Sequence, residues 1–89
     1  MSARSDLIAV ATGLNRPGVL PKGWSAILKR SEVHVVRHWT CTEIVITPTS
    51  ARASNLPGWA PKRPALKKDW AAKMIEEVAE VAAFLEMGN

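Results

Sequence analysis

A run of large apolar residues spaced three and four positions apart near the C-terminus constrains the fold more than any other feature of the sequence. In a helix this spacing puts them on one side, with charged residues on the opposite side. Pro64 suits the first helical turn, where its missing N–H costs nothing, and Gly88 suits a stop. The pattern predicts an amphipathic helix over residues 64–87. Its apolar stripe consists of Leu66, Trp70, Met74, Val78, Val81 and Leu85.

Short runs rich in β-branched residues precede this helix and favour strands. In the middle run, a period of two places Val33, Arg37 and Trp39 on one face and His34 and His38 on the other. The turns between the runs lack an Asn-Gly or Asp-Gly pair, so the hairpins are inferred from spacing. The predicted strands cover residues 25–29, 33–39 and 42–47.

Caps and breakers organise the rest of the chain. Ser5 as N-cap, Asp6 in the first turn and Gly13 at the end predict a short N-terminal helix. Prolines and small polar residues over 48–63, without sustained periodicity, predict a long irregular loop. We therefore expect an α+β fold, in which a small three-stranded antiparallel sheet packs against the long C-terminal amphipathic helix. The 89 residues suffice for a single domain over 1–89.

So small a domain depends on its few large side chains. Four of the five aromatic residues are tryptophan, and we expect Trp24, Trp39, Trp59 and Trp70 to supply much of the burial. The single cysteine, Cys41, cannot form a disulfide within the chain, which favours a reducing compartment. The apolar stretch over 7–11 is too short for a signal peptide or a bilayer span. These features predict a cytoplasmic protein.

Histidine and cysteine provide the nearest approach to a catalytic or metal site. His34, His38 and Cys41 form a His-x3-His-x2-Cys pattern of zinc-ligating residue types, but a fourth ligand is missing and Cys41 has the opposite strand parity. We interpret the two histidines as partly exposed strand residues and the thiol as buried. The sequence shows no phosphate-binding glycine loop or nucleophile elbow. We expect no enzymatic activity, no metal, no other cofactor and no small-molecule substrate.

Charge is divided unevenly along the chain. Residues 1–68 carry eleven Lys or Arg against three acids, whereas residues 69–89 carry one lysine against five acids. The basic body, with a tryptophan among its cations, is compatible with nucleic acid, because cations neutralise phosphates and an indole can stack on a base. The acidic face of the C-terminal helix argues against a membrane surface. The candidate nucleic-acid residues are Arg52, Trp59, Lys62, Arg63, Lys67 and Lys68.

The C-terminal helix is also apolar beyond its main stripe, because Ile75, Ala83, Phe84 and Met87 widen the apolar sector. A small sheet covers only part of such a surface. Either the N-terminal helix and the loop cover the rest, or a partner does. We expect a non-enzymatic protein-binding or regulatory module, its partner being another protein or a second copy in a homodimer, with nucleic-acid binding as the alternative. The candidate partner-binding residues are Trp59, Trp70, Phe84 and Met87.

In its small size, tryptophan-rich composition and lack of catalytic motifs, the chain is similar to the small inhibitor proteins carried by phages and other mobile elements. The similarity is one of general character and covers no alignable residues. It implies an inhibitory interaction with another protein. It transfers no site residue to this chain.

Overall fold

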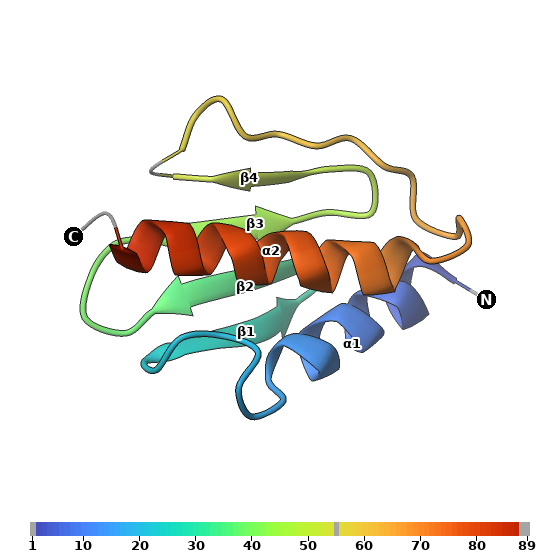
Figure 1. Ribbon diagram of the computed structural model, residues 1–89. Helices are drawn as coiled ribbons and strands as arrows, with labels where there is room; N and C mark the ends of the chain where they lie inside the picture. Colours follow the sequence, from blue (N-terminus) through green and yellow to red (C-terminus); the bar gives the residue numbers. More distant parts are fainter. Residues whose placement is uncertain (1, 55, 88–89) are drawn as a thin grey trace.

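Two helices lie on one face of a four-stranded antiparallel sheet (Figure 1). The computed structural model describes residues 2–54 and 56–87. Neighbouring strands in the sheet are consecutive in the sequence, so the order is β1-β2-β3-β4. In chain order the elements are α1 (Ala3–Leu14), β1 (Trp24–Lys29), β2 (Glu32–Arg37), β3 (Glu43–Ile46), β4 (Ala51–Ala53) and α2 (Trp70–Met87). The expected α+β class is confirmed.

Strict alternation decides which face of the sheet the helices cover. Val33 pairs with Ile46 and Val35 with Ile44, and all four side chains are fully buried beneath the helices. The residues between them, His34 and Val45, point to the other face, which the helices leave uncovered and which carries both polar and apolar side chains. One face covered by helices and one left open is a common arrangement in antiparallel sheets.

The sheet has four strands, not the expected three. Ala51 and Ala53 are buried beside β3, and this short strand lies inside the segment that we expected to be an irregular loop. The segment after β4 folds back along this strand. The Ala51 N–H donates to the Pro61 carbonyl oxygen, and Ser50 forms an antiparallel bridge with Lys62. Three residues give too short an alternation to indicate a strand from sequence.

Helix α2 begins at Trp70, six residues later than expected. Leu66 and Asp69 have φ values of 73° and 67°, a left-handed backbone that cannot continue a right-handed helix. Leu66 is 53% exposed, so it does not belong to the buried stripe. The helix extends to Met87 as expected, and Gly88, the expected stop, lies outside the described residues. Neither helix of the described chain meets the combined length and hydropathy that crossing a bilayer requires.

Helix α1 starts earlier and packs more closely than expected. Ser2, rather than Ser5, is its N-cap, and the Ser2 hydroxyl accepts the Ser5 backbone N–H. Gly13 is buried within the helix instead of ending it. A Cβ at this position would lie 2.3 Å from Cδ1 of Ile75, so the missing side chain permits the close approach of α1 to α2.

A side chain covers part of the free edge of β1. The Asn15 amide group donates to the Ala26 carbonyl oxygen at 2.8 Å, and its oxygen accepts the Ala26 N–H at 2.9 Å. These are the backbone groups that an added strand would use. Asn15 therefore ties the end of α1 to the sheet and reduces the capacity of this edge for strand pairing.

Candidate functional site

The four tryptophans have different environments. Trp24 and Trp70 are buried, and Trp59 is half-buried against the core. Trp39, which we expected on the buried face of β2, follows the end of that strand and is 59% exposed. Trp70, which we expected to contact a partner, is only 2% exposed and packs in the core.

One side of α2 faces the segment over 56–65. Trp70, Glu77 and Phe84 are spaced by seven residues and so lie along the same side of the helix. The Trp70 indole N–H donates to the Arg63 carbonyl oxygen at 2.8 Å, and the Arg63 guanidinium forms an ion pair with Glu77. Phe84 continues this side two turns beyond Glu77, where it is 61% exposed.

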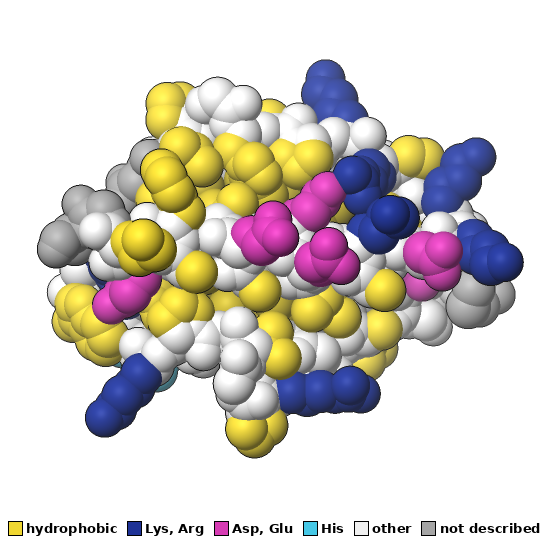
Figure 2. Space-filling view, in the orientation of Figure 1, with side chains coloured by type: hydrophobic (Ala, Val, Ile, Leu, Met, Phe, Trp, Pro, Cys, Tyr) yellow, Lys and Arg dark blue, Asp and Glu magenta, His cyan; other side chains and the backbone are white. Residues whose placement is uncertain are grey.

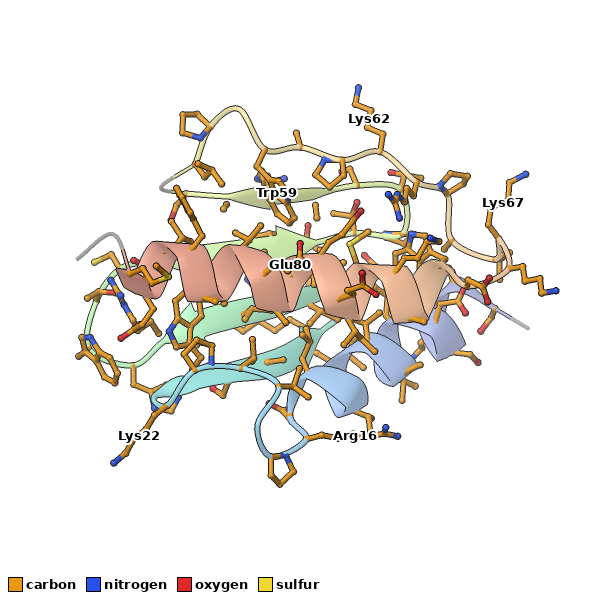
Figure 3. All side chains as sticks on the ribbon, in the orientation of Figure 1. Arg16, Lys22, Trp59, Lys62, Lys67 and Glu80 are labelled. Atoms are coloured by element: carbon orange, nitrogen blue, oxygen red, sulfur yellow. The ribbon has the colours of Figure 1, made fainter. Side chains whose placement is uncertain are left out.

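Hydrophobic side chains gather where the C-terminal turns of α2 meet this segment (Figure 2). Met87 is 85% exposed, Leu56 and Trp59 are partly buried, and Trp59 lies between its segment and α2 (Figure 3). We call Leu56, Trp59, Phe84 and Met87 the apolar end. The described part of the chain contains no pocket.

A buried arginine supports the last turn of α2. Arg37 is 5% exposed, and its guanidinium donates to the Glu86 carboxylate at 3.1 Å. Its centre lies 5.7 Å from the Trp24 ring and 5.9 Å from the Trp39 ring. Its other N–H groups donate to the hydroxyls of Thr40 and Thr42. We call these six residues the Arg37 cluster.

The same cluster perturbs one carboxyl group. The Trp24 indole N–H donates to Glu86 at 2.9 Å, and this bond, followed by the one from Arg37, lowers the pKa of Glu86 below its ordinary value of 4.5. The ionised Glu86 thus fixes the end of α2 against the turn after β2. The sequence contained a signal for this site, because Arg37 shares strand parity with Val33 and Val35, but nothing indicated Glu86 as its partner.

The outward face of α2 is acidic beside the apolar end. Glu76 and Glu80 are exposed and form no ion pair within the described residues. Figure 3 shows Glu80 on the outward side of the helix. The apolar end is therefore bordered by negative charge.

The six candidate nucleic-acid residues do not form one surface. Arg52 lies between two buried alanines of β4 and so points to the uncovered face of the sheet, whereas Trp59 packs against the core on the opposite side. Arg63 is neutralised by Glu77, and Lys62 points away from α2 (Figure 3). Lys67 and Lys68 are adjacent in the sequence, and both are exposed.

Histidine and cysteine side chains lie apart from one another. His34 contacts Glu32 and Glu43 through its two ring nitrogens, at 3.1 and 2.9 Å, and His38 contacts the Ser25 hydroxyl. Cys41 is exposed, which corrects the expected buried thiol, because it lies in the turn between β2 and β3. Within the described chain, no three His, Cys, Asp or Glu side chains form a group that could hold a metal ion.

Comparison with known proteins adds no functional information. No family model, curated protein or solved structure matches the chain. Any inference about function therefore rests on the surfaces of the structure.

Proposed function

We propose that this chain is a non-enzymatic protein-binding module, of a regulatory or inhibitory kind, and that its partner packs on the apolar end. The observation that carries the proposal is the 61% exposure of Phe84, on a helix that buries its large side chains Trp70, Met74 and Leu85. Aromatic side chains of this size are enriched among the residues that dominate binding energy.

The Arg37 cluster supports binding at this end of the molecule. It joins Glu86, in the last turn of α2, to the turn that carries Trp39. Phe84 and Met87 flank Glu86 in the sequence and so stand on an anchored turn. A surface held in place before binding loses less conformational entropy when the partner arrives.

Charge favours a particular partner chemistry. Glu76 and Glu80 are exposed on α2 in the turns before the apolar end. A partner segment with apolar side chains flanked by Lys or Arg would therefore complement both the apolar end and these carboxylates. Two copies paired along the length of α2 would instead place these carboxylates against one another. We therefore propose a basic, amphipathic segment of another protein as the partner.

Peptide selection tests this proposal without a known partner. A random peptide library is depleted on immobilised Phe84→Glu protein and then selected on the wild type. Selected peptides should combine aromatic or aliphatic residues with Lys or Arg. They should bind the Phe84→Glu variant at least about 10-fold more weakly than the wild type. Because Phe84 is exposed, the substitution should leave stability nearly unchanged.

Ile8→Glu is the matched control, because Ile8 is 46% exposed on α1. It should retain peptide affinity, whereas Glu76→Lys with Glu80→Lys should weaken it. Peptides that bind the wild type and Phe84→Glu equally would refute the surface. Light scattering that shows a wild-type dimer, dissociated by Phe84→Glu, would refute the heterologous partner and assign the surface to a second copy.

A further inference from the structure

Three segments distant in the sequence meet at the end of the molecule opposite the apolar end (Figure 1). The Arg4 guanidinium, in the first turn of α1, donates to the Arg30 carbonyl oxygen at 2.8 Å, which ties α1 to the turn between β1 and β2. Asp6 accepts the Leu66 backbone N–H at 2.7 Å, which ties α1 to the segment before α2. The start of α1 therefore joins both turns.

Each of these segments carries exposed cations, namely Arg4, Arg30, Lys67 and Lys68. None of the four forms an ion pair within the described residues. Figure 2 shows Lys and Arg side chains at this end, and Figure 3 shows Lys67 pointing outward from it. We call the four residues the basic end.

Backbone conformation is unusual in the same two turns. Arg30, Leu66 and Asp69 are the non-glycine residues with positive φ in the described chain, at 52°, 73° and 67°. Glycine or asparagine adopts this conformation at lower cost. The chain thus places charged and large residues in strained turns at the basic end, and such strain is concentrated at functional sites.

We propose that the basic end binds the phosphate backbone of a duplex nucleic acid. Four unpaired cations from three segments can contact successive phosphates. They outnumber the two carboxylates of the α1 start and the 66–69 turn, of which Asp6 accepts the Leu66 N–H and Asp69 is exposed beside Lys68. A single strand would need an aromatic platform for its bases. This end offers none, because Trp24 and Trp70 are buried and the other aromatic residues lie elsewhere.

Salt-dependent binding of labelled duplexes tests the assignment. Fluorescence anisotropy would be measured with a fluorescein-labelled 25-base-pair DNA and its RNA counterpart over a NaCl series. Four phosphate contacts predict that the logarithm of the binding constant for DNA falls with the logarithm of the NaCl concentration with a slope of about −4. Binding should therefore be roughly 100-fold weaker at 200 mM NaCl than at 50 mM NaCl. Lys67→Ala with Lys68→Ala should reduce the slope by about 2.

Arg16→Ala with Lys22→Ala is the matched control, because it removes the same charge from exposed residues away from this end (Figure 3). The control should keep the wild-type slope, and Phe84→Glu should also bind like the wild type, which separates this site from the apolar end. Equal losses in the two double variants would overturn the proposal. So would tighter binding of a single-stranded oligonucleotide, or no duplex binding at roughly 100 µM protein in 50 mM salt.

Discussion

Removing the Arg37 guanidinium should destabilise the fold more than any other single loss of charge. Arg37→Ala deletes hydrogen bonds to Glu86, Thr40 and Thr42 and contacts with two indole rings. Three bonds at about 1 kcal/mol each, with a further ~1 kcal/mol from the rings, give about 4 kcal/mol. The Glu86 side chain is 37% exposed and regains water when freed, so we expect about 3 kcal/mol.

Urea denaturation followed by circular dichroism measures this loss. An m value of about 1–3 kcal/mol/M converts the expected change into a midpoint lower by about 1 M or more. Arg37→Lys, which keeps the charge but not the forked geometry, should fall between the wild type and Arg37→Ala. The exposed Arg16→Ala control should stay within about 0.5 kcal/mol of the wild type. A loss below about 1 kcal/mol for Arg37→Ala would refute the reasoning, because exposed ion pairs contribute that little.

Three further perturbations test other features. Asn15→Ala should cost about 1–3 kcal/mol in urea denaturation, because both Ala26 backbone groups lose their partner, and an unchanged midpoint would contradict this. Gly23→Ala should lower the free energy of unfolding by about 1–3 kcal/mol or more, since φ at this position is 89° and a Cβ would lie 1.8 Å from the Trp39 ring. Increased quenching of indole fluorescence by acrylamide would show that the Trp39 ring is displaced. The lowered pKa of Glu86 stabilises the fold above pH 4.5 and this contribution is lost as pH falls below that value, so the melting temperature of Glu86→Gln should decline less with acid than that of the wild type. Parallel declines would contradict the assignment.

Local pattern predicted the elements whose burial is uniform along their length. The stripe of α2 was readable because its members from Trp70 onward all face the core. The first residue of α2 could not be predicted, because Leu66 continues the apolar spacing of the helix although its own backbone is left-handed. The Leu66 N–H donates to Asp6, sixty residues away in the sequence, and no local pattern indicates this bond. Similarly, Gly13 resembles a helix stop in sequence, and only its contact with Ile75 reveals its packing role.

The candidate surfaces, too, could be predicted from the sequence only in part. Helical spacing places Trp70 on the main stripe and Phe84 and Met87 off it, but it left open what covers the latter two, and the structure shows both exposed. The exposure of Trp39 could not be predicted, because hydrophobicity alone favours burial and strand β2 ends two residues earlier. The basic end depends on contacts across 26 and 60 residues, which no local pattern encodes.

The contact between α1 and α2 also determines when the chain can fold during its synthesis. The sheet is a local meander and can pair as it emerges, but its apolar face and α1 remain without their cover until α2 leaves the ribosome. At about 5–20 residues per second, the 18 residues of α2 require about 1–4 s. During that interval the nascent chain exposes a surface suited to chaperones. Completion of the domain therefore waits for the synthesis of α2.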